Sequence, residues 1–308
     1  MQTSKRDIDK IVKFVFGTSL DHKDILSEIK ATTHEVYIIK LKGKRYAVRI
    51  ATKAQPKLYT EAWVLKNQKR LHIPGPALIR WDNTKKIIPY CFMVETCIEG
   101  EHISKKDKIN MRRTYEKLSQ NILIKIHKQR MRGFGPLNAH GLGEYGSWKG
   151  FVEARFNKAF PKLKEGKLLS NKVLLQISQA HNENVKEMNI KSSRLLMGDL
   201  HPKNFFIKNG KFSGFVDLKA VMAGDPLWEY AMIKFFLGMD IWPTYIRKTK
   251  QSLRRYSYYF MLITMNKLWF RFKNGDPTTN IKKRIRTILR QTIKIANPKT
   301  MDWRIPPF

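Results

Sequence analysis

The sequence predicts an α+β protein in which a β-rich N-terminal part is followed by a mainly helical remainder. The first hundred residues contain runs of β-branched and aromatic side chains around turn signals, which is typical of antiparallel strands. Beyond residue 110, apolar side chains recur at three- and four-residue spacing, which indicates amphipathic helices. No internal repeat or low-complexity linker divides the 308 residues, so two lobes of one protein fit the length better than two independent domains.

The N-terminal part is predicted to begin its sheet with a hairpin. Val36–Leu41 and Arg45–Ile50 are strand-like runs, and the turn Lys42–Lys44 between them contains a glycine. A helical segment follows at Thr60–Leu65, and the apolar run Ile87–Glu95 reads as a buried strand. The strands and the helix together predict a small sheet with one helix packed beside it.

The C-terminal part is predicted to consist mainly of helices. Met111–Ile126 has apolar residues at helical spacing and ends before Gly133, and a second helix begins at Ser147. Val173–Met188 gives a third helix, and Tyr256–Phe272 is apolar and aromatic enough to be a core helix.

The segment from Met197 to Asn204 carries the most informative polar residues of the chain. Asp199 is followed five residues later by Asn204, and thirteen residues beyond that Asp217 closes a short apolar run. An aspartate can accept the proton of an attacking hydroxyl, and an asparagine with a second aspartate can supply hard oxygen ligands to Mg²⁺. In this order the three residues predict a phosphoryl-transfer site. Each one alone would usually be structural.

The residues between Asn204 and Asp217 predict a β-hairpin that brings these side chains to one edge. Phe205–Ile207 and Phe212–Val216 are strand-like, and Asn209 and Gly210 between them both tolerate positive φ. The predicted order is loop, strand, turn, strand and carboxylate.

These motifs resemble the aminoglycoside phosphotransferase and choline kinase family of small-molecule kinases. The resemblance rests on the Asp-Leu-His-Pro sequence that starts at Asp199, on Asn204 and Asp217, and on Gly-Asp-Pro at Gly224. It implies a two-lobed protein-kinase-like fold, with a nucleotide-binding lobe over residues 1–98 and a catalytic and substrate-binding lobe over residues 99–308. It also implies Mg²⁺, and ATP as the phosphoryl donor with GTP not excluded.

The resemblance assigns further residues to nucleotide binding. Arg49 stands where a phosphate-binding lysine is usual in kinases, and Glu61 matches the ion-pair partner of that lysine. The open alternative is an edge-strand arginine and an unrelated helix glutamate. The main chain from Glu95 to Cys97 matches the connector that meets the nucleobase.

Three positions depart from the family pattern. The expected phosphate-covering loop before Val36 has no glycine. Either the side chains of Thr32, Thr33 and His34 donate hydrogen bonds instead, or the triphosphate is held more loosely. Met197 replaces a residue that is commonly polar. Lys219 replaces a residue that is often acidic or glycine, so it is expected either to repel a second Mg²⁺ or to bind a phosphate.

Two acids that follow the site are expected to support loops and not to act in catalysis. They are Asp225 and Glu229.

The charge of the chain bears on which molecule accepts the phosphoryl group. Sixty Lys and Arg residues against 25 Asp and Glu give a net charge of +35, and from Ile241 to Phe308 there are only two acids. A basic field repels cations, so polycationic aminoglycosides rank low among acceptors, and a hydroxyl on an anionic or neutral small molecule ranks higher. The alternative is a weakly active or inactive kinase-like protein whose basic C-terminal region binds RNA, another polyanion or an anionic membrane surface. A solvated, lysine-rich surface explains the charge equally well.

Composition and apolar stretches also indicate the cellular compartment in which the protein is expected. The longest apolar stretch, Tyr258–Met265, is too short to span a bilayer, and no apolar signal core follows the N-terminal cations. Cys91 and Cys97 lack metal-ligand spacing and are expected to be reduced thiols. We therefore expect a cytoplasmic protein without a transmembrane segment.

Overall fold

The computed structural model describes residues 3–30, 34–51, 56–103 and 108–275, and its contacts group the chain into two compact units. Unit 1 comprises the described residues of Met1–Ile103, Asn138–Gly141 and Pro202–Val221. Unit 2 comprises the described residues of Ser104–Leu137, Leu142–His201 and Met222–Phe308. The predicted lobes 1–98 and 99–308 are continuous in sequence, whereas these units are not, because the segment 202–221 belongs with unit 1. The assignment of nucleotide binding and catalysis to the two lobes stays a prediction.

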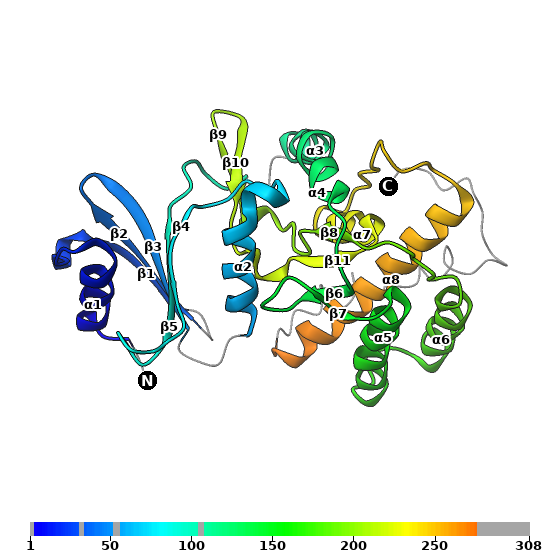
Figure 1. Cartoon of the computed structure of the whole chain (residues 1–308). Coiled ribbons are helices and arrows are strands. Elements are labelled where there is room, and N and C mark those ends of the chain that lie inside the picture. The colour runs from blue at the N-terminus through cyan, green and yellow to red at the C-terminus, as the bar shows by residue number, and fades with distance from the viewer. Residues whose placement is uncertain (1–2, 31–33, 52–55, 104–107, 276–308) are drawn as a thin grey trace. The chain divides into compact units, whose positions relative to one another are not determined.

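Unit 1 is built on an antiparallel sheet with the strand order β1-β2-β3-β5-β4 (Figure 1). Its strands are β1 (Ile25–Lys30), β2 (Glu35–Leu41), β3 (Lys44–Ala51), β4 (Leu78–Asp82) and β5 (Cys91–Thr96). The predicted hairpin is confirmed: Leu41 pairs with Lys44, and the turn residues Lys42 and Gly43 have φ of 47° and 77°. Two successive positive φ values match the right-handed twist of the strands, which explains the glycine there.

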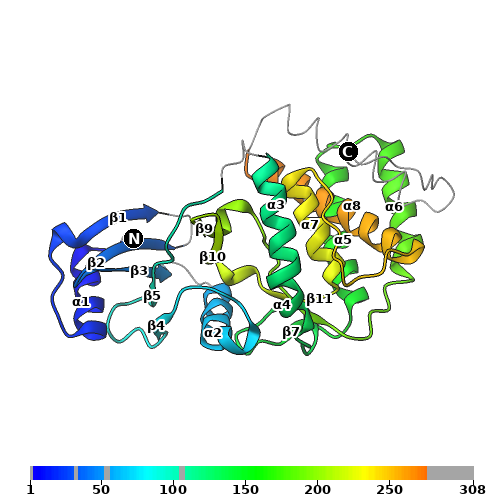
Figure 2. The ribbon, with the colours of Figure 1, turned by 90° about the horizontal axis from the view of Figure 1, so that it is seen from above.

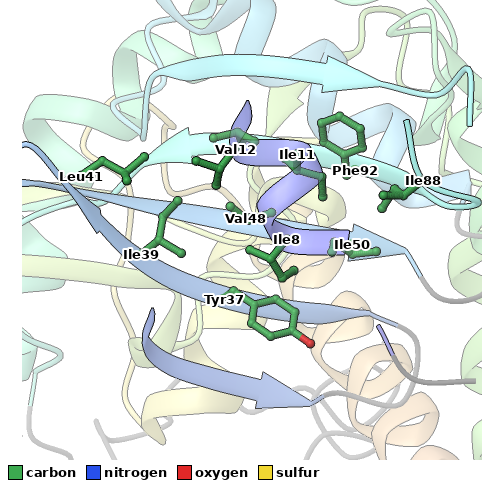
Figure 3. Packing of buried hydrophobic residues seen from close by; sticks show 11 residues of the cluster. Ile8, Ile11, Val12, Tyr37, Ile39, Leu41, Val48, Ile50, Ile88 and Phe92 are labelled. Atoms are coloured by element: carbon green, nitrogen blue, oxygen red, sulfur yellow. The ribbon is translucent and has the colours of Figure 1, made fainter. Parts of the chain in front are cut away.

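A helix that the sequence analysis did not predict, α1 (Lys5–Phe16), covers one face of this sheet. Ser4 caps its N-terminus in a capping box with Asp7, and Gly17 ends it in the left-handed conformation. Figure 3 shows the apolar face of α1 packed against alternate residues of three strands. The cluster contains Ile8, Ile11, Val12, Tyr37, Ile39, Leu41, Val48, Ile50, Ile88, Phe92 and Val94. Each fully buried aliphatic side chain contributes about 1.5–3 kcal/mol.

The rest of unit 1 is a helix and a second hairpin. The predicted helix at Thr60 is confirmed as α2 (Pro56–Leu71). The hairpin β9 (Phe205–Lys208) and β10 (Lys211–Phe215) is also confirmed, with Asn209 and Gly210 at φ of 51° and 69°. Short 3₁₀ turns, η3 (Pro202–Asn204) and η4 (Leu218–Ala220), flank the hairpin.

Unit 2 combines helices with a small sheet of strand order β7-β6-β11-β8. Its helices are α3 (Lys108–Leu118), α4 (Ile124–Lys128), α5 (Trp148–Glu165), α6 (Asn171–Val185), α7 (Pro226–Leu237) and α8 (Lys250–Lys273). Its strands are β6 (Phe134–Leu137), β7 (Gly143–Tyr145), β8 (Arg194–Leu196) and β11 (Met222–Gly224). Helices α5, α6 and α8 pack against one another (Figure 2). The helices predicted at Ser147, Val173–Met188 and Tyr256–Phe272 are thus confirmed within a few residues.

An aromatic cluster forms the centre of unit 2. Trp148 is fully buried, and its ring contacts the rings of Phe151, Trp228 and Tyr259. Its indole N–H donates to the Tyr259 hydroxyl at 2.7 Å, which satisfies the polar atom of a buried tryptophan. A Cβ at Gly224 would lie 2.1 Å from the Trp148 ring, so only glycine lets β11 approach so closely.

Two predicted elements have different bounds in the structure. The single helix predicted over Met111–Ile126 is interrupted by a π-helical turn at Ser119–Leu123, where the Ser119 hydroxyl is 2.6 Å from the Tyr230 hydroxyl. Apolar spacing carries no signal for such a turn. The strand predicted over Ile87–Glu95 begins only at Cys91, and Pro89 before it has no N–H to join a sheet.

None of the helices in the described part of the chain is long and apolar enough to cross a bilayer.

Candidate functional site

The alternation of side chains on β2 and β3 builds a cavity in unit 1. Successive strand residues point to opposite faces, so Tyr37 and Ile39 face α1 while Val36 and Ile38 line the cavity. On β3 the same alternation turns Ala47, Arg45 and Arg49 toward the cavity. A register shift of one residue would exchange the two faces, so the hydrophobic core fixes which cations reach the cavity.

The cavity has a volume of about 390 Å³, within the usual range of small-ligand sites. Apolar side chains from β2, β3, the connector after β5 and β9 form part of its wall, and charged groups form the rest. The charged and polar lining residues are His34, Arg45, Arg49, Glu95, Thr96, Cys97, His102, Lys203 and Asp217.

Arg49 lies at the centre of the charged part. Its Nη1 is 2.5 Å from Glu61 Oε1 and 3.7 Å from Glu95 Oε1, and its Nη2 is 3.7 Å from Asp217 Oδ1. Its side chain is only 7% exposed. Burial acts to lower the pKa of Arg49, but the charges of Glu61 and Glu95 outweigh burial and raise it, so the guanidinium is charged. The structure therefore brings together the two residues that the sequence analysis paired, Arg49 and Glu61.

Glu61 has a second contact that explains its position on α2. Its Oε1 also accepts the main-chain N–H of Leu218 at 2.8 Å. One buried carboxylate oxygen thus holds the arginine of β3 and the residue after Asp217. The sequence gives no signal for this contact, because 157 positions separate the two residues.

Asp217 lies between two cations in unit 1. Its backbone is in the left-handed region at φ 59°, and its Oδ1 is 2.8 Å from Lys219 Nζ as well as near Arg49. The ammonium that the sequence analysis noted as a departure therefore points to the predicted metal ligand. His34 lines the same cavity, and burial, together with the charges of Arg49 and Lys219, lowers its pKa.

Glu95 and Cys97 both line the cavity. Glu95 is 6% exposed, its Oε2 is buried without a hydrogen-bond partner among the described residues, and burial raises its pKa to about 7. Cys97 donates its main-chain N–H to the Arg45 carbonyl at 3.1 Å, and burial raises the pKa of its thiol. Thr32 and Thr33 lie outside the described residues.

Asn204 ends the turn η3 just before β9 in unit 1. Its main-chain carbonyl accepts the N–H of Val216 at 2.8 Å, which ties it to the residue before Asp217. The hairpin predicted between them therefore brings the backbones of Asn204 and Asp217 to the same end of β9 and β10. Asp217 lines the cavity, whereas Asn204 is not among the lining residues.

Asp199 belongs to unit 2, on the loop after β8. The residues on either side of it are held by buried groups: the Gly198 N–H donates to Glu229 Oε1 at 2.8 Å, and the Tyr115 hydroxyl donates to the Leu200 carbonyl at 2.6 Å. Asp199 itself is partly exposed. The loop is thus fixed on both sides of a carboxylate that solvent can reach.

A buried network in unit 2 holds Glu229 in turn. His127 Nε2 is 2.6 Å from Glu229 Oε2, and His127 Nδ1 contacts the Tyr245 hydroxyl. Asp225 caps α7 through the Leu227 N–H and accepts from the Tyr259 hydroxyl at 2.9 Å. Glu229 therefore supports the loop of Asp199, whereas Asp225 supports the start of α7. That neither acid acts in catalysis stays a prediction. Tyr115 and Tyr245 were not predicted, since tyrosines at helical spacing read as core residues.

Comparisons with known proteins bear on the family and the fold of this chain. The model of a family described as the phosphotransferase enzyme family matches residues 26–259. No curated protein matches the chain. Solved structures do match: a thermostable mutant of the aminoglycoside phosphotransferase APH(4)-Ia, in a ternary complex with AMP-PNP and hygromycin B, has 15% identity and a TM-score of 0.68 over 95% of this chain and 99% of its own.

Two further structures are similar at comparable length. A putative fructosamine-3-kinase from Haemophilus somnus has 16% identity and a TM-score of 0.62, covering 93% of this chain and 97% of its own. The choline kinase LicA from Streptococcus pneumoniae has 16% identity and a TM-score of 0.62, covering 94% and 98%. At such identities the likeness shows the fold, which confirms the predicted α+β, protein-kinase-like class. Because the family model matches well over half of the sequence, this chain belongs to the phosphotransferase enzyme family.

Proposed function

We propose that this chain is an ATP-dependent phosphotransferase that transfers the γ-phosphoryl group to a hydroxyl of a small molecule. The observation that carries the proposal is the buried Arg49, paired with Glu61 and next to Asp217, in the wall of a ligand-sized cavity. A buried cation beside an acid that can bind a metal is the combination that phosphate groups require.

Unit 1 is proposed to bind the nucleotide. The guanidinium of Arg49 binds phosphate oxygens in a fork, and Lys203 in the same wall adds a second cation. The apolar residues Val36, Ile38 and Ala47 suit a purine base. The polar edge of the base is assigned to the main chain of Glu95–Cys97, where the N–H groups of Thr96 and Cys97 already donate to the Ala77 and Arg45 carbonyls. GTP is the alternative donor. The AMP-PNP bound by the APH(4)-Ia mutant supports the use of a nucleotide.

The predicted Mg²⁺ ligands fit a metal in part. Asp217 Oδ1 is a buried hard oxygen of the kind that binds Mg²⁺, but Lys219 Nζ lies 2.8 Å from it and Arg49 Nη2 lies 3.7 Å from it. Asn204 would be the second ligand, and Lys219 already competes for Asp217. When bound, Mg²⁺ neutralises charge on the transferred phosphoryl group.

Asp199 is proposed to be the catalytic base. Its carboxylate accepts the proton of the acceptor hydroxyl while the hydroxyl oxygen forms a bond to the γ-phosphorus. The bond from that phosphorus to the β,γ-bridging oxygen breaks, and its electron pair leaves with ADP. Glu229 and Tyr115 hold the loop on both sides, so that the carboxylate keeps one orientation.

The test is a screen for acceptor-dependent ADP release against a library of metabolites and antibiotics. With an acceptor in hand, Asp199→Asn should lower turnover by roughly 10²–10⁴-fold while ATP affinity is kept, since only the proton acceptor is lost. Asp217→Ala should abolish the metal dependence of nucleotide binding. Equal turnover in Asp199→Asn would remove the assigned base, and no ADP release with any acceptor would reject the function.

A further inference from the structure

His102 extends the cavity wall of unit 1 just beyond the connector after β5. The residue lines the cavity, and its ring lies against the ring of Phe206, with the two centroids 4.3 Å apart. Its Nδ1 is 3.1 Å from the main-chain carbonyl oxygen of Phe205. Both contacts are made with strand β9, so the imidazole is held in one place although it remains exposed to solvent.

The contact with Phe205 fixes the role of each ring nitrogen of His102. A carbonyl oxygen only accepts hydrogen bonds, so Nδ1 carries the hydrogen and donates it. In the neutral imidazole the other nitrogen, Nε2, then has no hydrogen and is an acceptor. No donor among the described residues bonds to Nε2. The cavity wall therefore presents a hydrogen-bond acceptor that suits a hydroxyl of a ligand.

On the wall formed by the sheet, the proposed base end and phosphate end of the cavity are separated along β3. Ala47 pairs with Glu95, the first residue of the connector that is proposed to meet the nucleobase. Arg49 lies two positions farther along β3, about 7 Å from Ala47, and its guanidinium is next to Asp217. A nucleotide that spans this distance has its sugar between the two ends.

The wall formed by the hairpin runs in the same direction. Glu101 exchanges two main-chain hydrogen bonds of 2.9 Å with Ile207, which places the connector beside β9. His102 bonds to Phe205, two positions closer to the end of the hairpin at which Asp217 follows β10. His102 therefore lies between the connector and Asp217, at the level of the sugar of a bound nucleotide.

We propose that His102 Nε2 accepts a hydrogen bond from the 2′- or 3′-hydroxyl of the nucleotide, so that the chain selects ribonucleotides over nucleotides that lack this hydroxyl. This inference rests on the proposed function, because it takes the cavity as the nucleotide site. Adenine and guanine nucleotides share the ribose hydroxyls, so the contact does not depend on which of them is the phosphoryl donor. Loss of the hydroxyl removes one hydrogen bond, which lowers affinity by about threefold to tenfold.

Binding of nucleoside diphosphates to the full chain tests the contact. ADP, 2′-deoxy-ADP and 3′-deoxy-ADP are titrated by calorimetry with Mg²⁺ at pH 8, which favours the neutral imidazole. GDP and its two deoxy forms make a second series. In the series that binds, the ribonucleotide should bind about threefold to tenfold more tightly than one of its deoxy forms. Equal affinities of all three forms, or no binding of any nucleotide, overturn the proposal.

Variants of His102 separate recognition of the sugar from support of the fold. His102→Phe keeps a ring against Phe206 but has no acceptor, so the ratio of ribonucleotide to deoxynucleotide affinity should fall to about one. His102→Gln carries an amide oxygen that can accept a hydroxyl and should keep part of the ratio. His140→Gln is the control and should keep the full ratio, because His140 is an exposed histidine of unit 1 that does not line the cavity.

The ratio is the decisive measurement, because a merely structural role of His102 does not change it. If His102→Phe weakens all three forms by the same factor, the histidine supports the fold or contacts the phosphates, and the proposal is wrong.

The outcomes also separate this inference from the proposed function. If the ratio depends on His102 but no phosphoryl group is ever transferred, the sugar contact stands and the enzymatic proposal fails. If transfer occurs with the same KM for the ribonucleotide and for both deoxy forms, the enzyme stands and the role of His102 fails.

Discussion

The residue with the most direct effect on the nucleotide site is Lys219, because its ammonium and a metal ion compete for the same oxygen of Asp217. The two atoms are 2.8 Å apart, and the lysine side chain is 35% exposed, so the ion pair is worth about 0.2–1 kcal/mol. Lys219→Met should therefore tighten Mg²⁺ binding to the nucleotide-bound protein by up to about fivefold. Calorimetric Mg²⁺ titration with a non-hydrolysable ATP analogue measures the change.

Lys211→Met is the matched control for Lys219→Met. Lys211 is an exposed lysine of β10 in the same unit, so its removal changes the net charge equally without touching Asp217. Its Mg²⁺ affinity should equal that of the wild type. If Lys219→Met instead weakens nucleotide binding and leaves Mg²⁺ affinity alone, the lysine binds phosphate and does not compete with the metal.

Glu95 should make the stability of the protein fall as pH rises. Burial raises its pKa in the folded protein to about 7, above its ordinary value of 4.5, so the folded state holds the proton more tightly. The stabilisation is complete below the unfolded pKa and is lost as pH rises through 7, by about 3 kcal/mol at most. Urea unfolding at pH 5 and pH 8 should show this loss in the wild type and not in Glu95→Gln. Parallel profiles for the two proteins would contradict it.

Some contacts between site residues could be predicted from the sequence, and others could not. Arg49 and Glu61 could be paired because each lies in a short motif at a familiar place, and the structure brings them within 2.5 Å. The contact of Glu61 with the main chain of Leu218 joins residues 157 positions apart. No local pattern indicates such a contact, so only the fold reveals it.

At the scale of elements, the connector after β5 depends on a glycine that approaches β9. Gly100 has φ of 116°, and a Cβ there would lie 2.4 Å from the Ile207 carbonyl oxygen, where Glu101 bridges to Ile207. Gly100→Ala should therefore destabilise the protein by about 2 kcal/mol or more, and distort the cavity wall that Gly100 lines. Urea unfolding and nucleotide affinity measure the two effects.

Gly210→Ala separates backbone strain from the clash at Gly100. Gly210 also has a positive φ, 69°, but a Cβ there meets nothing within 4 Å. Its replacement should cost about 1–2 kcal/mol and leave nucleotide affinity unchanged. Equal losses in both variants would show that the close approach of the connector to β9 contributes nothing.

Elements with strong local signals were predictable, and those set by tertiary contacts were not. Both hairpins were predictable, because Gly43 and Asn209–Gly210 tolerate positive φ. The first turn was predicted over Lys42–Lys44, whereas Lys44 already pairs with Leu41 in the structure. The short strands of unit 2 were missed, since three or four residues give no readable alternation. Helix α1 was not predicted, although Ser4 and Asp7 form a capping box, which is a local signal for a helix start.

At the scale of the whole molecule, the net charge argues against a polycationic acceptor. The chain carries a net charge of +35, and such a field repels cations. A general field and a specific contact differ in range, because the field is screened beyond about 10 Å at 0.1 M salt while a half-buried contact is screened much less. Acceptor affinity measured against salt therefore separates the two contributions.

The last prediction uses this difference in screening. Raising KCl from about 50 to about 300 mM should lower kcat/KM for a phosphorylated acceptor and raise any residual kcat/KM for a polycationic aminoglycoside, because salt weakens both the attraction and the repulsion. A neutral hydroxyl acceptor is the control and should show little change. Parallel decreases for the anionic and cationic acceptors would show that salt acts on the protein itself, and that the charge has no part in selecting the acceptor.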